Sequence, residues 1–145
     1  LSRAVTEVTH NHPEGIKGAE ATAVATFLAR TGVTKDEIRD VIVRDYYLLD
    51  FTIDEIRPGY KFDVSCQGSV PQALQAFFES TSFEDAIRNA ISIGGDSDTI
   101  AAICGAVAGA YYGVPKDIRA KAESFLDVYL LQRLYYFERM FALGS

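Results

Sequence analysis

Cysteine, tryptophan and long hydrophobic runs are scarce or missing in this sequence, and each absence excludes a class of protein. Two cysteines, Cys66 and Cys104, are too few for a disulfide framework, and there is no CxxC pair to bind zinc. We therefore expect free, buried thiols in a reducing compartment. No apolar run reaches the roughly 20 residues of a membrane span, and no signal sequence opens the chain. The expected location is cytoplasmic, with no membrane partner.

Basic residues are also in the minority. The sequence has 14 Lys and Arg against 20 Asp and Glu, a net charge of −6. Non-specific binding to nucleic acid depends on basic side chains that neutralise phosphates, so this balance argues against it. It does not exclude a small phosphate-containing ligand, because a divalent cation can supply the positive charge.

The length and balance of the sequence fit one globular domain. The chain has 145 residues, of which 48% are hydrophobic and 23% are charged. This is enough to bury one core and too little for two. We predict a single domain over residues 1–145. The chain opens on Leu1, and residues 1–8 read as the end of a helix, so we also expect a processed or truncated piece.

Helical signals dominate the first third of the chain. Pro13 starts an expected helix that runs to about Arg30, with one apolar face formed by Ile16, Ala19, Ala23 and Phe27. Gly15 and Gly18 make this helix thin, so we expect another helix to pack close against it. Residues 34–37 fit a capping box that opens a second helix.

Four further segments complete the expected fold. The helical pattern fails over residues 52–67, where residues 60–64 alternate as a short extended stretch would. Pro71 starts the next expected helix, and Ser82 with Asp85 caps another that ends at two glycines. A central helix of small residues then runs from about Asp98 to Tyr112, and a last helical region follows Pro115. We predict an all-α fold, a compact multi-helix bundle.

The most informative segment is Gly-Gly-Asp-Ser-Asp-Thr at residues 94–99. Asp96, Asp98 and the hydroxyl of Thr99 form a group of hard oxygen ligands at a tight glycine turn. The start of the following helix favours negative charge there, so the carboxylates can stay ionised. The simpler alternative is that Asp96 or Ser97 only caps the helix.

Two other motifs with closely spaced aspartates do not fit. An EF-hand loop would need a further oxygen ligand and a glutamate at its twelfth position, but Ile100 and Val107 stand at those positions. A phosphatase of the haloacid dehalogenase type would show DxDxT after a strand. Here Thr99 directly follows Asp98, and the surroundings are helical.

GGDSDT resembles the GGDTDT motif of the ADP-ribosylglycohydrolase family, with Ser97 in place of the usual threonine. The resemblance continues on both sides, at residues 86–90 and 101–106. It implies that Asp96, Asp98 and Thr99 ligate two Mg²⁺ ions, or Mn²⁺ in their place. It also implies that Asp96 and Asp98 are catalytic, and that the bundle is of the ADP-ribosylglycohydrolase type.

Both histidines lie in the segment Thr-His-Asn-His-Pro-Glu-Gly at residues 9–15. Zinc sites usually have three or four ligands, and no further histidine completes such a set. Surface histidines at a helix entry are one interpretation. The segment also resembles the family's sequence before a helix, which implies that His12 contacts the substrate. Asn11 and His10 are secondary candidates.

The loop at residues 63–71 leads into a helix whose free backbone N–H groups can hold an anion, or is an ordinary loop and cap. The resemblance implies that Gln67, Gly68 and Ser69 line the ADP-ribose pocket, without the aromatic residue that some members have near this position. Cys66 is rejected as a nucleophile, because neither histidine is shown to lie near it.

The resemblance implies magnesium-dependent hydrolysis of ADP-ribosyl linkages, with ADP-ribose or an ADP-ribosylated protein as partner. It covers only the C-terminal half of a typical member, whose N-terminal half holds a second acidic cluster. We therefore expect a missing N-terminal half or another chain to complete the site. The alternatives are a non-catalytic ADP-ribose-binding or crystallin-like structural protein, and a phosphohydrolase that acts on another nucleotide or sugar.

Overall fold

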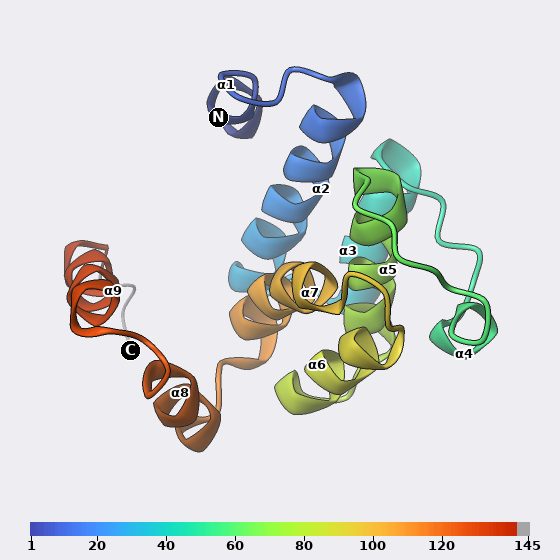
Figure 1. The fold of residues 1–145 in the computed structure, drawn as a ribbon. Helices are drawn as coiled ribbons and strands as arrows, with labels where there is room; N and C mark the ends of the chain where they lie inside the picture. Colours follow the sequence, from blue (N-terminus) through green and yellow to red (C-terminus); the bar gives the residue numbers. More distant parts are fainter. Residues whose placement is uncertain (142–145) are drawn as a thin grey trace. The chain divides into compact units, whose positions relative to one another are not determined.

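The computed structural model describes residues 1–141, and these residues form helices joined by turns and loops, without a strand (Figure 1). The prediction of an all-α fold is therefore confirmed. The chain divides into two compact units, Leu1–Gly113 and a second that begins at Val114. The prediction of one domain over residues 1–145 extends beyond the described residues and stays a prediction. Within the described part, no helix is long and apolar enough to span a membrane.

The first unit contains seven of the helices, and the second contains two. The helices of the first unit are α1 Ser2–Thr6, α2 Pro13–Arg30, α3 Lys35–Asp45, α4 Ile53–Ile56, α5 Cys66–Glu79, α6 Phe83–Ser92 and α7 Ser97–Tyr112. The helices of the second unit are α8 Lys116–Glu123 and α9 Val128–Met140.

Helix α7 lies at the centre of the first unit, as its small residues predict. It packs against α2, α5 and α6 (Figure 1). Ile100, Cys104 and Val107 are completely buried in these contacts. Ala102 and Ala106 remain exposed, so one side of α7 is uncovered by the described residues.

Helix α2 has the predicted bounds but a different buried face. Its buried residues are Gly18, Ala21, Ala25 and Ala29, whereas Phe27 of the predicted face is 65% exposed. The reason is the close approach of α5, which confirms the expectation of a tightly packed neighbour. A β-carbon at Gly18 would lie 3.2 Å from Cβ of Cys66. Small side chains permit this distance, and a buried Phe27 would hold the two helices apart.

Helix α5 begins at Cys66, so the prediction that Pro71 starts it is wrong. The Ser65 hydroxyl accepts a hydrogen bond from the Gly68 backbone N–H at 3.1 Å and closes the first turn earlier in the chain. Pro71 lies inside the helix and is buried. As the sixth residue of the helix, Pro71 leaves the Gln67 carbonyl without its intrahelical N–H partner, and burial of the proline and its neighbours offsets that loss.

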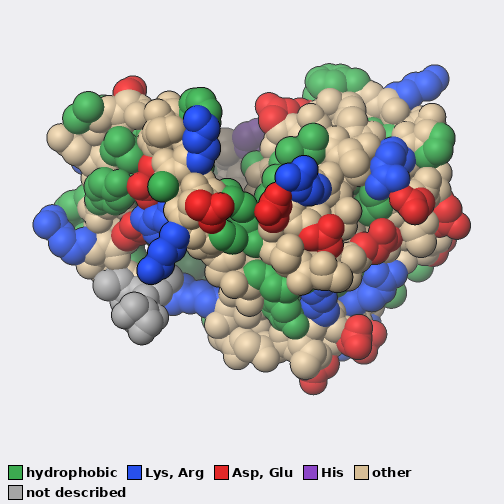
Figure 2. All heavy atoms as spheres, turned by 90° about the horizontal axis from the view of Figure 1, so that it is seen from below, with side chains coloured by type: hydrophobic (Ala, Val, Ile, Leu, Met, Phe, Trp, Pro, Cys, Tyr) green, Lys and Arg blue, Asp and Glu red, His purple; other side chains and the backbone are tan. Residues whose placement is uncertain are grey.

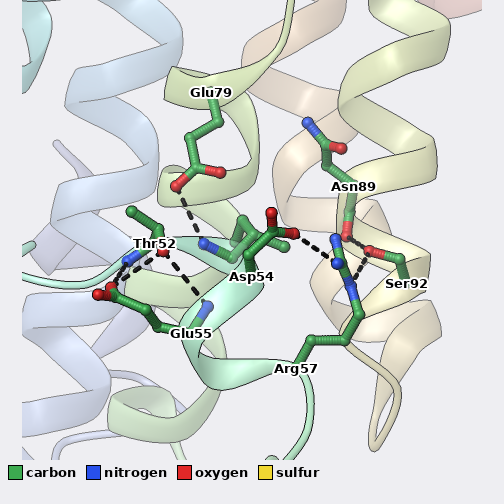
Figure 3. A network of polar contacts seen from close by, with 8 residues as sticks. Thr52, Asp54, Glu55, Arg57, Glu79, Asn89 and Ser92 are labelled. Atoms are coloured by element: carbon green, nitrogen blue, oxygen red, sulfur yellow. Dashed lines mark hydrogen bonds and ion pairs between the residues drawn. The ribbon is translucent and has the colours of Figure 1, made fainter.

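Helix α4 was not predicted from the sequence. A network of polar contacts connects it to α5 and α6 (Figure 3). Thr52 and Glu55 form a capping box at its start. The Glu79 carboxylate of α5 accepts a hydrogen bond from the Ile53 backbone N–H at 3.0 Å. At the other end, Arg57 donates to the Ser92 hydroxyl at 3.1 Å, just before the glycine turn of residues 94–95. The network therefore fixes the loop after α4 beside the end of α6.

The second unit consists of α8 and α9, and neither helix contains a buried residue. Arg119 joins them through an ion pair of 2.7 Å with Glu138 of α9, and it also pairs with Glu123 within α8 at 2.7 Å. Aromatic side chains of this unit are exposed at Phe125, Tyr129, Tyr135, Tyr136, Phe137 and Phe141. Figure 2 shows hydrophobic side chains exposed between charged ones on the face seen there.

Candidate functional site

The site is built on the GGDSDT turn between α6 and α7. Gly94 and Gly95 have φ angles of 81° and 61°, a left-handed conformation that glycine adopts without strain. The prediction that two glycines end the preceding helix is confirmed. Asp96 occupies the N-cap position of α7, but its side chain makes no capping hydrogen bond. The Asp96 carboxylate therefore does not cap the helix, as the simpler alternative would require.

The two carboxyl groups of the motif lie close together. Contact with the Asp96 side chain holds the pKa of Asp98 below its usual range, and the backbone N–H groups of Thr99 and Asp98 add to this effect. Asp98 and Thr99 are exposed in the first turn of α7. Two acidic groups this close repel each other when both are ionised, and a cation between them removes that repulsion.

The donor set suits a hard divalent cation but is small. Asp96, Asp98 and Thr99 offer carboxylate and hydroxyl oxygens, the ligands that Mg²⁺ prefers. Among residues 1–141, no group of three or more His, Cys, Asp or Glu side chains is arranged to hold a metal. An octahedral ion takes about six oxygens, so these three residues fit as one part of a coordination sphere.

Tyr60 joins the GGDSDT turn to the start of α5. A β-carbon at Gly95 would lie 2.5 Å from Cε1 of Tyr60, so the ring is packed directly against the turn. The hydroxyl of the same side chain donates a hydrogen bond to the Gly68 backbone carbonyl. Burial and the negative charges of Asp63 and Asp96 raise the pKa of Tyr60, which keeps this hydroxyl protonated. In the sequence, residues 60–64 show only an alternation of apolar and polar side chains, and no local signal predicts this contact.

A pocket of about 470 Å³ lies beside Tyr60. It is lined by Gly59, Tyr60, Lys61, Phe62, Asp63, Gln67, Gly68 and Gln72. Two of the predicted substrate-binding residues, Gln67 and Gly68, therefore face one cavity. The third, Ser69, is only 3% exposed, and its hydroxyl donates to the Asp63 carbonyl at 3.3 Å.

The predicted anion cradle at the start of α5 is already partly filled by the chain itself. The Asp63 carboxylate accepts a hydrogen bond from the Ser65 backbone N–H at 2.7 Å. This bond and the Ser65 side chain lower the pKa of Asp63. The Gly68 N–H is taken by the Ser65 hydroxyl. An external anion would therefore compete with a carboxylate that belongs to the protein.

The structure places the histidines at the entry of α2. His12 is the N-cap of this helix, and its ring nitrogen Nδ1 accepts a hydrogen bond from the Glu14 backbone N–H at 3.2 Å. The His10 ring pairs with the Thr9 hydroxyl at 2.9 Å. Asn11 is exposed between them. His12 therefore lies at a helix entry, as one interpretation of the sequence predicted. Its contact with a substrate stays a prediction.

The first turns of α2 meet the start of α5 at Tyr47. The Lys17 ammonium lies 4.5 Å from the centre of the Tyr47 ring and pairs with Glu14 at 2.9 Å. Tyr47 is 7% exposed, and burial, with Cys66 and Glu14 nearby, raises its pKa to about 12. Its hydroxyl has no hydrogen-bond partner among the described residues. A buried hydroxyl of this kind destabilises the fold.

Tyr47→Phe is expected to raise the free energy of unfolding by about 1 kcal/mol, because it removes this unpartnered hydroxyl. The advantage should grow from pH 10 to about 12, where Tyr47 stays protonated in the folded chain. The unfolded tyrosine ionises in this range, so the parent protein loses stability as the pH rises. Urea unfolding at pH 7 and pH 11 measures both effects. A less stable variant at pH 7 would show that the hydroxyl is satisfied.

Both cysteines are free thiols. Cys104 is completely buried in α7, and this burial raises its pKa to about 12. Cys66 is half-buried at the start of α5, whereas we expected from the sequence that both thiols would be fully buried. The difference arises because Cys66 is the first residue of its helix, at the edge of the contact with Gly18.

Comparison with known proteins agrees with the motif. Residues 1–140 match the ADP-ribosylglycohydrolase family. ADP-ribosylarginine hydrolase Tri1 of Pseudomonas putida is 33% identical over 118 residues, which cover 74% of this chain and 30% of the relative. ADP-ribosylhydrolase ARH3 of Mus musculus is 30% identical over 128 residues, which cover 79% of this chain and 32% of the relative.

A solved structure shares the fold as well. A chain of an ADP-ribosylglycohydrolase-related protein complex superimposes with a TM-score of 0.61 and 26% identity, over 79% of this chain and 44% of that one. An uncharacterized protein of Archaeoglobus fulgidus is 31% identical over 71% of this chain and 39% of its own length. The chain thus spans about a third of the length of these curated relatives. It belongs to the ADP-ribosylglycohydrolase family.

Proposed function

We propose that this chain takes part in the hydrolysis of ADP-ribosyl linkages and contributes part of a divalent metal site and part of the ADP-ribose pocket. The observation that carries the proposal is the adjacent pair of carboxyl groups, Asp96 and Asp98, at the start of α7. Tyr60, which packs against the turn just before this pair, lines a pocket of about 470 Å³ in a member of this family. The named relatives are hydrolases of ADP-ribosylated substrates.

The chemistry of the site follows from its oxygens. Asp96, Asp98 and Thr99 would hold Mg²⁺ or Mn²⁺, and such an ion polarises a ligand oxygen and lowers the pKa of bound water. Two ions would need more ligands than these three residues supply. The negative charge of the carboxylates also favours positive charge that develops on a ribose carbon when its bond to a leaving group breaks.

The remaining residues orient the substrate in this proposal. Gln67 and Gly68 line the pocket on the α5 side, and the Gln67 amide can both donate and accept hydrogen bonds with ribose hydroxyls. Lys61, in the same pocket, offers the positive charge that a diphosphate requires. Ser69 supports the Asp63 loop from a buried position. His12 and Asn11 are the further proposed contacts, at the entry of α2.

Calorimetric titration of ADP-ribose into this chain, with magnesium and again with a chelator, tests the proposal. We expect binding that requires magnesium and that Asp98→Asn weakens by about 10-fold or more, because loss of one carboxylate removes a ligand and its charge. Asp36→Asn is the matched control, since Asp36 is the second residue of α3 as Asp98 is of α7. It should bind as the parent chain does.

The other outcomes separate the alternatives. Binding that is equal with the chelator and insensitive to Asp98→Asn would contradict the metal site and favour an ADP-ribose-binding protein without catalysis. Absence of binding under both conditions would contradict the proposal that these residues form a working part of the pocket.

A further inference from the structure

Tyr60 is the side chain that physically joins the two parts of the proposed site. Its ring covers Gly95, one residue before Asp96, and its hydroxyl is bonded to Gly68 in the first turn of α5. The same side chain lines the pocket. The Arg57–Ser92 hydrogen bond anchors the preceding loop to the end of α6. Tyr60 is therefore restrained in three ways: by the contact of its ring with Gly95, by the hydrogen bond of its hydroxyl, and by the anchored loop that precedes it.

The glycine turn gives the ring a specific place to lie. Gly95 has a φ of 61°, and the space where its β-carbon would be is occupied by the Tyr60 ring and the Lys61 carbonyl. Gly94 is also left-handed, but nothing lies within 4 Å of its β-carbon position. The ring thus restrains one of the two glycines, and that glycine directly precedes the carboxylate pair.

We propose that Tyr60 is a positioning residue for the Asp96–Asp98 pair, which it holds in the geometry that binds a divalent cation. The ring restrains the turn at Gly95, and the hydroxyl fixes the ring by its hydrogen bond to Gly68. This inference rests on the proposed function, because it assumes that the carboxylate pair holds a cation. It assigns a role to a residue outside the GGDSDT motif, the histidine segment and the loop 63–71.

Manganese binding to the whole chain is the direct test, with Mn²⁺ alone as the probe and free Mn²⁺ measured by electron paramagnetic resonance. Residues that support metal ligands typically change affinity by about 10- to 100-fold. We expect Tyr60→Leu, which lacks both ring and hydroxyl, to weaken binding by about 10-fold or more. Tyr60→Phe keeps the ring and should recover most of that loss, to within about 5-fold of the parent chain.

Two further variants set the limits of the measurement. Val64→Ala changes a 75% exposed side chain in the same loop and should bind Mn²⁺ as the parent chain does. Asp98→Asn removes a proposed ligand, so its Mn²⁺ affinity is the value expected when the site is lost. Parent-like affinity in Tyr60→Leu would overturn the inference. If the parent chain binds no better than Asp98→Asn, the metal site of the proposed function is contradicted instead.

Backbone amide NMR signals test the role of Tyr60 in the turn without any metal. In Tyr60→Leu, the signals of residues 94–99 should shift more than those of the rest of α7, and Tyr60→Phe should restore most of them. Unchanged signals over residues 94–99 would overturn the inference whatever the manganese result. A shift in these signals together with a loss of Mn²⁺ affinity would support it.

Discussion

Phe77→Ala is expected to lower the free energy of unfolding by about 3–5 kcal/mol, the largest loss of stability that we predict for a substitution in this chain. Phe77 is completely buried in α5. Its ring centre lies 5.2 Å from that of Phe78, 5.4 Å from Tyr111 and 6.2 Å from Tyr112. The Lys35 ammonium lies 5.1 Å above the same ring. Alanine would leave a cavity that these large, mutually packed side chains cannot fill.

Urea unfolding at neutral pH measures this loss, with Phe27→Ala as the control. Phe27 is 65% exposed, so its truncation should cost less than about 1 kcal/mol. A domain of this size is typically stable by about 5–15 kcal/mol, so the Phe77 variant should be close to unfolding at body temperature. If the two variants lose similar stability, the aromatic cluster around Phe77 is not the packed core of the first unit.

Gly95→Ala is expected to destabilise the chain by about 2–4 kcal/mol, against about 1 kcal/mol for Gly94→Ala. Both positions are left-handed, so both variants pay the conformational cost of a β-carbon there. Only at Gly95 would that carbon also meet the Tyr60 ring at 2.5 Å and the Lys61 carbonyl at 3.2 Å. The difference between the two variants therefore measures how tightly Tyr60 is packed on the turn.

Urea unfolding of the two variants under identical conditions gives that difference. The Mn²⁺ affinity of Gly95→Ala should fall as well, because the ring that restrains the carboxylate pair is displaced. Equal losses of stability in the two variants would show that the ring moves away at little cost. The role of Tyr60 in positioning the turn would then be contradicted on stability grounds alone.

Local signals in the sequence were sufficient for most of the helices. The capping box at Thr34 and the Ser82 cap lie where they were predicted. The central helix starts within one residue of its predicted position and ends at Gly113, which is left-handed. Such signals act within one helical turn, so the residues that decide them are neighbours in the chain.

Three features were not predicted from these local signals. The buried face of α2 depends on the approach of α5, since Gly18 meets Cys66 and Val70. The early start of α5 depends on a serine cap that outweighs a proline inside the helix. Helix α4 is only four residues long, and its start is held by the Glu79 carboxylate of α5. For α2 and α4 the deciding contact comes from another element, so no periodicity within the segment reports it. For α5 the Ser65 cap is a local signal, but Pro71 is the more usual mark of a helix start.

The same distinction applies to the candidate site, of which one part could be predicted from the sequence and another could not. The sequence by itself determined the family, because six adjacent residues carry both the glycine turn and the carboxyl and hydroxyl groups that we propose as ligands. Only the tertiary structure decided what surrounds that motif: the Tyr60 ring lies against Gly95 and close to the Asp96 charge. These contacts join segments far apart in the chain, and packing rather than local conformational preference brings them together.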